Sequence, residues 1–222
     1  MKKLSWVLLA VVACYASTTG AAEFYVDPQS GSSENDGSSQ RTWRSLLDVI
    51  NHGLVESLDW ARLPYKRESQ LVAKNSGAPI KAGDTIYLRS GYHGTLEIQN
   101  HYNTDHVTIA AQQGHFPKLA RIRIRSSAFW TLRGLQVSSE FANVREASTL
   151  IDLDSHGFRG PVRDIVVEDC QVFSVKDSSK WTVQDWNQRA CNGIDVDGRN
   201  MIVRKCKFKN VNFGISVSAT QS

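Results

Sequence analysis

Two segments of the chain decide its fold: RDIVVEDCQVFSV at residues 163–175 and RNMIVRKCKFKNV at residues 199–211. They align without a gap. A second pair, GIDV at 193–196 and GISV at 214–217, repeats with an offset of 21 residues. Short strands that repeat at this spacing are typical of the stacked coils of a β-solenoid. The sequence therefore predicts an all-β chain built from coils.

The predicted strands are short, alternate apolar with polar residues, and are followed by Gly, Asn, Asp or Ser, which favour turns. We expect about five coils, with strands that stack as three parallel sheets. The first sheet is predicted to contain residues 95–99, 120–125, 150–154, 192–197 and 214–218. The second contains 107–111, 129–132, 164–168 and 200–204, and the third 135–138, 170–175 and 206–211. Cys170 and Cys206 then lie one above the other as small core residues.

A short amphipathic helix is predicted before the coils, between Trp43 and Asn51. Its apolar residues are Leu46, Leu47, Val49 and Ile50. We expect this helix to cover the open end of the first coil, because the terminal units of a solenoid need a cap. Residues 52–80 look like an insertion, in which the pattern assigns no role to Trp60, Pro64 or Tyr65.

The first 22 residues are typical of a secretory signal peptide. Lys2 and Lys3 precede an apolar run at 4–13, and small residues follow before Glu23. The run is too short to cross a bilayer as a permanent helix. We expect a single secreted or periplasmic domain at 23–222. The alternative is a lipobox, VVAC at 11–14, in which acylation of Cys14 anchors the protein to the cell envelope.

The composition indicates an ordinary soluble globular protein. The chain has 222 residues, of which 41% are hydrophobic and 22% charged, which excludes disordered, collagen-like and coiled-coil classes. A net charge of +4 gives no basis for nucleic-acid binding. After residue 22 the cysteines are Cys170, Cys191 and Cys206, an odd number at irregular spacing. That spacing indicates neither a disulfide framework nor a C-x-x-C metal site.

The segments that precede the coils resemble those of a known superfamily. They are FYVDP at 24–28, GSSENDG at 31–37, the helical stretch 43–51 and AGDTIYLRSGYHG at 82–94. In this order they resemble the start of right-handed parallel β-helix proteins of the pectate-lyase-like superfamily, and the resemblance covers nearly all of the exported chain. It implies a right-handed parallel β-helix with a short N-terminal capping helix. Members usually have more coils and a C-terminal cap, so we expect the chain to be incomplete at its C-terminus.

The superfamily contains lyases, hydrolases, uronate epimerases, esterases and non-catalytic adhesins, and its polymer usually binds on the exposed face of the first sheet. With a period of two, the apolar residues of that sheet point inward and the polar residues outward. One outward column contains Glu97, Arg123, Asp152, Asp195 and Ser216, and the other Gln99, Arg125, Asp154, Asp197 and Ser218. Neighbouring coils lie about 4.8 Å apart, so Asp152 is expected to stack on Asp195, and Asp154 on Asp197.

Stacked carboxylates repel each other and need compensation. A Ca²⁺ ion would provide it through carboxylate ligands, a shared proton would raise one pKa, and Arg123 or Arg125 would supply positive charge. A solvated face whose charges simply alternate is the plain alternative. Four acids exceed what two arginines neutralise, which favours a functional site. The candidate metal ligands are Asp152, Asp154, Asp195 and Asp197.

This surface suits an acidic, uronate-containing polysaccharide. Arg123 or Arg125 would hold a uronate carboxylate, and Ca²⁺ would bridge it to Asp152 and Asp195, which acidifies the proton at C5. Abstraction of that proton starts β-elimination or epimerisation. We expect a polysaccharide lyase first and a uronate C5-epimerase second, with a carboxylic-acid hydrolase as a minor option. A non-catalytic glycan-binding or scaffold β-helix remains the alternative outside catalysis.

The candidate catalytic residues are Arg123, Arg125, Asp154, Asp197 and His156. The segment from Asp154 to His156 resembles the Asp-Pro-His motif of mannuronan C5-epimerases, although Ser155 replaces the proline and Gly157 the following acid. A lone histidine in a turn is the competing interpretation. Other candidate bases, which the sequence does not rank, are Lys176, Lys180 and Lys207.

A long excursion at 174–190 interrupts the coil period and carries Trp181 and Trp186. Two roles are open for these tryptophans. They either rim the groove and offer apolar faces to sugar rings, or pack on the solenoid wall. We expect a monomer whose partner is the acidic polysaccharide.

Overall fold

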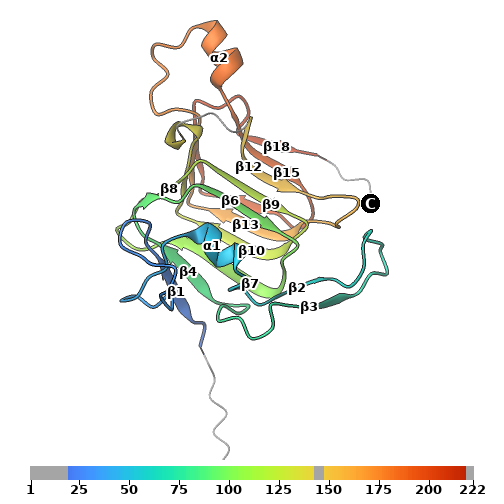
Figure 1. Ribbon diagram of the computed structural model, residues 1–222. Coiled ribbons are helices and arrows are strands. Elements are labelled where there is room, and N and C mark those ends of the chain that lie inside the picture. The colour runs from blue at the N-terminus through green and yellow to red at the C-terminus, as the bar shows by residue number, and fades with distance from the viewer. Residues whose placement is uncertain (1–19, 143–147, 219–222) are drawn as a thin grey trace, which may run out of the picture.

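The computed structural model describes residues 20–142 and 148–218, which form a right-handed parallel β-helix (Figure 1). Its three sheets stack coil on coil, as the repeats predict. The described helices include none long and apolar enough to span a membrane. Residues 1–19 of the predicted signal peptide, including Cys14, lie outside the described part of the chain, as do Gln221 and Ser222.

The five strands predicted for the first sheet are all present and stack in parallel. This sheet, called the β6–β18 sheet below, consists of β6 (Thr95–Gln99), β9 (Arg121–Arg125), β12 (Thr149–Asp154), β15 (Asn192–Asp197) and β18 (Ile215–Val217). Ile194 pairs with Ile215 in adjacent coils, as the GIDV and GISV repeat predicts. A Cβ atom on Gly193 would lie 2.3 Å from the carbonyl oxygen of Gly214, so position 193 needs glycine for the two coils to approach.

The other two sheets contain the predicted strands and additional ones nearer the N-terminus. The β1–β16 sheet has as its main path β1 (Glu23–Val26), β4 (Thr85–Leu88), β7 (Tyr102–Ala111), β10 (Ala128–Arg133), β13 (Arg163–Glu168) and β16 (Ile202–Arg204), and two further strands join it beside β7. The β5–β17 sheet consists of β5 (Gly91–Tyr92), β8 (Pro117–Leu119), β11 (Gln136–Val137), β14 (Gln171–Phe173) and β17 (Lys207–Lys209). A 3₁₀ helix, η1 (Ser139–Phe141), follows β11.

The corners between sheets repeat as exactly as the strands do. Asp164 and Asn200 occupy equivalent corners with φ of 55° and 56°, and Asp169 and Lys205 share a second corner with φ of 54°. This left-handed backbone region is one that Asn and Asp tolerate better than most residues. The polar residues at these left-handed positions, in and beside the strands, therefore turn the chain from one sheet to the next.

The interior is a stack of aliphatic side chains. Ile122, Ile124, Ile151 and Leu153 are fully buried between the three sheets. Cys170 is buried and Cys206 is half-buried against the same core, and the described cysteines are all free thiols. The inward placement predicted for the Cys170 and Cys206 pair is therefore confirmed, with Cys206 in the last described coil.

The predicted capping helix is present as α1 (Leu46–Asn51). The Ser45 side chain caps it by accepting a hydrogen bond from the Asp48 backbone N–H at 3.1 Å. Three of its predicted apolar residues, Leu46, Val49 and Ile50, are buried, whereas Leu47 lies on the outer side. The helix lies against β6 at the end of the β6–β18 sheet (Figure 1).

The insertion at 52–80 contains an antiparallel hairpin of β2 (Ser57–Trp60) and β3 (Leu71–Lys74). The hairpin is tied to the body at the loop end of β2, where Trp60 Nε1 donates a hydrogen bond to the hydroxyl of Tyr102 at 3.0 Å. Tyr65 also packs on Trp60, with ring centroids 4.8 Å apart. Trp60 and Tyr65, which the pattern left without a role, therefore hold the hairpin against β7.

Candidate functional site

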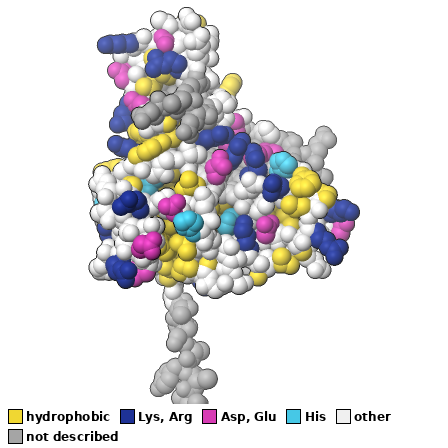
Figure 2. Space-filling model, in the orientation of Figure 1, with side chains coloured by type: hydrophobic (Ala, Val, Ile, Leu, Met, Phe, Trp, Pro, Cys, Tyr) yellow, Lys and Arg dark blue, Asp and Glu magenta, His cyan; other side chains and the backbone are white. Residues whose placement is uncertain are grey.

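The outward face of the β6–β18 sheet carries the two predicted polar columns. In register, Asp152 lies between Arg123 and Asp195, and Asp154 lies between Arg125 and Asp197. The predicted stacking of the two aspartate pairs is therefore present in the strand pairing. Figure 2 shows basic and acidic side chains close together on this side of the molecule.

The carboxylates of β12 are held by the arginines of β9. Asp152 Oδ2 accepts hydrogen bonds from Arg123 Nε at 2.9 Å and from Arg121 Nη2 at 3.2 Å. Asp154 Oδ2 accepts one from Arg125 Nε at 2.7 Å. All of these side chains are only partly exposed, which reduces the screening of their charges by solvent. Arginine therefore provides much of the compensation that the stacked acids need.

Two further arginines belong to this face, and the sequence analysis missed both. Arg121 is the first outward residue of the RIRIR strand, so the period of two was sufficient to find it. Arg159 comes from the turn after β12. With the Gln99 amide oriented so that its oxygen faces the guanidinium, Oε1 accepts a hydrogen bond from Arg159 Nε at 2.8 Å. No periodic pattern marks a residue that reaches the face from a turn.

The aspartates of β15 are placed differently from those of β12. Asp195 Oδ2 accepts a hydrogen bond from the Thr149 hydroxyl at 2.7 Å, whereas its Oδ1 is buried without a hydrogen-bond partner among the described residues. Asp197 lies beside Asp154 in the strand register. The carboxylate of Asp195 is therefore held by a hydroxyl group, whereas those of Asp152 and Asp154 are held by guanidinium groups.

These carboxylates do not form a preformed calcium-binding site. Ca²⁺ takes about six to eight oxygen ligands, whereas Asp152 and Asp154 are engaged by guanidinium groups. Within residues 20–142 and 148–218, no cluster of three or more His, Cys, Asp or Glu side chains is arranged to hold a metal ion. In the described part of the chain, the buried Oδ1 of Asp195 is a feature that favours a cation. Calcium binding thus remains a prediction, and no chemical step below depends on it.

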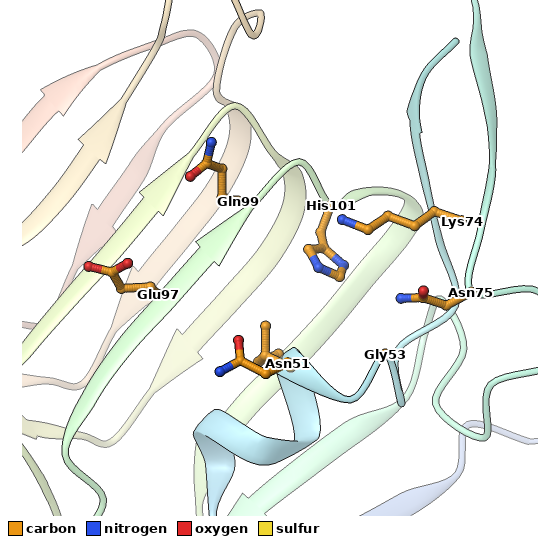
Figure 3. A pocket seen from close by; sticks show the side chains of 8 residues that line it. Asn51, Gly53, Lys74, Asn75, Glu97, Gln99 and His101 are labelled. Carbon is orange, nitrogen blue, oxygen red and sulfur yellow. The ribbon is translucent and has the colours of Figure 1, made fainter.

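A pocket of about 340 Å³ lies where the polar face meets α1 and the hairpin (Figure 3). The residues that line it are Ile50, Asn51, Gly53, Lys74, Asn75, Glu97, Gln99 and His101. Glu97 and Gln99 are the first members of the two outward columns, so the pocket is continuous with the face. Figure 3 shows them on one side of the pocket, with Asn51 at the end of α1 and Lys74 opposite.

Burial affects both basic residues of the pocket. Lys74 Nζ donates a hydrogen bond to the Asn100 carbonyl at 2.8 Å, and burial lowers the pKa of its ammonium from the ordinary value. His101 is buried and its Nδ1 lies 3.0 Å from the Ser57 hydroxyl. Burial, followed by the nearby Lys74 charge, lowers the pKa of His101 to about 3. His101 is therefore neutral at physiological pH and serves as a structural wall of the pocket.

The predicted base His156 lies exposed in the turn after β12. The Nδ1 atom of its ring accepts a hydrogen bond from the Phe158 backbone N–H at 3.2 Å. The backbone N–H of His156 donates a hydrogen bond to the Gly160 carbonyl at 3.0 Å. Ser155, which replaces the proline of the Asp-Pro-His motif, donates its hydroxyl to the Asp197 carbonyl at 2.7 Å. These contacts favour a turn-forming role for His156, and its catalytic role stays untested.

The excursion at 174–190 forms α2 (Val183–Arg189), which begins with a capping box between Thr182 and Asp185. Figure 1 shows α2 projecting from the body beyond the ends of the strands. Trp181 and Trp186 pack edge to face with centroids 5.0 Å apart, and the Arg189 guanidinium lies 5.1 Å from the centre of the Trp181 ring. The two half-buried indoles thus pack on each other, and whether they also contact sugar stays a prediction.

The chain was compared with known proteins at the level of sequence. No protein-family model matches it. A search of curated protein sequences gives no match either. The fold and the geometry of the polar face therefore carry the functional conclusion.

Proposed function

We propose that this protein is an exported β-helix protein, similar to the pectate-lyase-like superfamily, which binds an acidic polysaccharide along its outward polar face and cleaves it by β-elimination. The observation that carries the proposal is the way the arginines of β9 are held. Among the described residues, Arg123 and Arg125 each contact their aspartate through Nε. Their Nη groups remain available to hold a substrate carboxylate through paired hydrogen bonds.

The proposed elimination depends on an arginine that neutralises the carboxylate of the bound uronate. A uronate whose carboxylate is bound by a guanidinium has a more acidic proton at C5, because the charge that develops on proton removal is stabilised. In the proposed step a carboxylate of the Asp154 and Asp197 pair takes this proton. The C4–O4 bond then breaks, a C4=C5 double bond forms, and the departing O4 takes a proton from water. The pairing of Asp154 with Arg125 in the free protein positions this base beside the bound uronate.

Incubation with alginate, pectate and chondroitin sulfate tests the proposal. Elimination creates a conjugated unsaturated uronate, so we expect the ultraviolet absorbance to rise with one of these polymers. Inversion at C5 seen by NMR without a rise in absorbance would indicate an epimerase. Binding without either change would indicate a non-catalytic glycan-binding scaffold, which the existing Arg–Asp pairs on the face favour as the second candidate. Absence of both binding and reaction would refute the proposal.

Arg125→Lys is expected to weaken binding of an acidic oligosaccharide by about tenfold or more, because an ammonium cannot reproduce two parallel hydrogen bonds. The free energy of unfolding should change by only about 0–1 kcal/mol, since the pair with Asp154 is partly exposed. Isothermal titration calorimetry and thermal melting measure the two quantities. Arg133→Lys, on the β1–β16 sheet, is the matched control and should leave oligosaccharide affinity unchanged. Equal losses in the two variants would show that Arg125 has no special role in binding.

A further inference from the structure

The polar face is closed at one end. Beyond β6, the position of the next strand is taken by α1, and the residues after the helix meet the end of β3. Gly53 and Asn75 both have left-handed backbones, and a Cβ atom on Gly53 would lie 2.9 Å from Asn75 Oδ1. Asn75 Nδ2 also donates a hydrogen bond to the Val55 carbonyl at 3.1 Å. The helix end and the hairpin are therefore packed closely into one wall beside the pocket.

The opposite end of the face lies at β18, where the outward residue is small and neutral. The columns continue from Asp195 to Ser216, which pairs with it on β18. Because serine is small and neutral, this end of the column offers no bulky or charged barrier to a bound polymer. A chain lying along the columns thus has room to extend toward β18, and it meets the wall formed by α1 and β3 at β6.

We propose that the pocket is a subsite for the terminal sugar of an acidic polysaccharide, so that the protein recognises a chain end and acts from it. This inference rests on the proposed binding of an acidic polysaccharide along the polar face. The sugar at the chain end occupies the pocket, and the following sugar lies over β9, where Arg123 and Arg125 bind its carboxylate.

The chemistry of the pocket fits a uronic acid. Lys74 supplies positive charge, and its hydrogen bond to the Asn100 carbonyl leaves other ammonium protons for a sugar carboxylate. Among the described residues, the Glu97 carboxylate makes no ion pair or hydrogen bond, so it is free to accept from sugar hydroxyls. Asn51 adds an amide with both a donor and an acceptor. A pocket with one cation and several acceptors matches a ring that carries one carboxylate and several hydroxyls.

The position of the pocket also predicts the products. The reacting carboxylate is held by β9, the strand next to β6, so the cleaved bond lies close to the chain end. Repeated action from the end releases fragments of one short length from the start of the reaction. Attack within the chain would instead give a broad ladder of fragments. Separation of the early products by size therefore tests the chain-end inference without a binding measurement: one short fragment supports it, and a broad ladder contradicts it.

Glu97→Gln is the first variant to test, because this exposed residue has no partner within residues 20–142 and 148–218 and the replacement keeps its shape. We expect it to weaken binding of a pectate or alginate tetrasaccharide by about tenfold, the effect of losing a charge-assisted hydrogen bond. Glu68→Gln, an exposed residue in the hairpin loop outside the pocket, is the matched control and should bind as the wild type does. Lys74→Met should also weaken binding, with thermal melting used to check that the hairpin remains attached.

A second measurement counts chain ends. At a fixed total concentration of uronate, mild hydrolysis of the polymer raises the number of ends, and we expect the amount of bound protein to rise with it. Binding that follows total uronate, together with unchanged affinity in Glu97→Gln, would overturn the chain-end inference. The proposed function would survive that result if Arg125→Lys still weakens binding. If the wild-type protein binds no acidic oligosaccharide, the proposed function and this inference both fail.

Discussion

Replacement of Trp130 by alanine is expected to lower the free energy of unfolding by about 3–5 kcal/mol, the cost of removing a large aromatic side chain from a packed core. Trp130 on β10 is fully buried and is the largest such side chain in the described structure. Its Nε1 donates a hydrogen bond to the His101 carbonyl at 3.1 Å. The substitution therefore leaves both a cavity and a buried carbonyl without its donor.

Chemical denaturation measures this loss, with two further variants as references. Trp130→Phe retains much of the volume and loses the hydrogen bond, so we expect a smaller cost of about 1–3 kcal/mol. Trp181→Ala removes an indole that packs outside the core, and should cost about 1 kcal/mol or less. If Trp130→Ala and Trp181→Ala cost the same, the interior of the solenoid is not packed as described.

The second large effect is a loss of stability in mild acid that depends on His101. Its pKa is about 3 in the folded protein, against an ordinary value of 6.5. Between these values the unfolded chain binds a proton that the folded protein excludes. The free energy of unfolding therefore falls as the pH is lowered from about 6.5, by about 1.4 kcal/mol per pH unit for this group. Burial also lowers the pKa of His93, which adds to the loss in the same direction.

The contribution of His101 is isolated by comparing slopes of stability against pH. His101→Asn keeps a polar side chain beside Ser57 but cannot titrate, so its stability should fall less steeply between pH 6.5 and about 5. This window lies above the range in which most carboxylates titrate. Trp181→Ala, which removes no titratable group and lies outside the core, is the control and should keep the wild-type slope. If the stability of His101→Asn falls with pH as steeply as that of the wild type, His101 binds its proton equally in the folded and unfolded states. The predicted lowering of its pKa by burial would then be wrong.

Among the strands, those that were predicted correctly lie where each coil repeats its neighbour. Inward positions such as Ile122, Ile151 and Ile194 face the same interior, so their sequence alternation repeats from coil to coil. The strands that were missed include β5 and β8, which contain two and three residues. A strand this short carries too little alternation to be recognised, and its pairing comes from the neighbouring coils.

The sequence predicted some residues of the candidate site and missed others. The stacking of Asp152 on Asp195 follows from strand register, which the repeats already contain. Arg159 and Lys74 were not found, because one reaches the face from a turn and the other from an inserted hairpin. The direction of such segments depends on contacts with residues distant in the sequence, including Tyr102, whose hydroxyl accepts a hydrogen bond from Trp60 of the hairpin. No local pattern encodes these contacts.

By itself, the sequence determined the coil repeat, the inward and outward faces and the order of charges along each column, because these depend on a period of two and on equivalent positions in successive coils. The tertiary structure alone decided that Arg121 joins Arg123 on Asp152, where the pocket lies, and that α1 and the hairpin close one end of the face. The physical reason is the range of the interactions: backbone periodicity is local, whereas side-chain contacts and the packing of an insertion depend on segments that only the folded chain brings together.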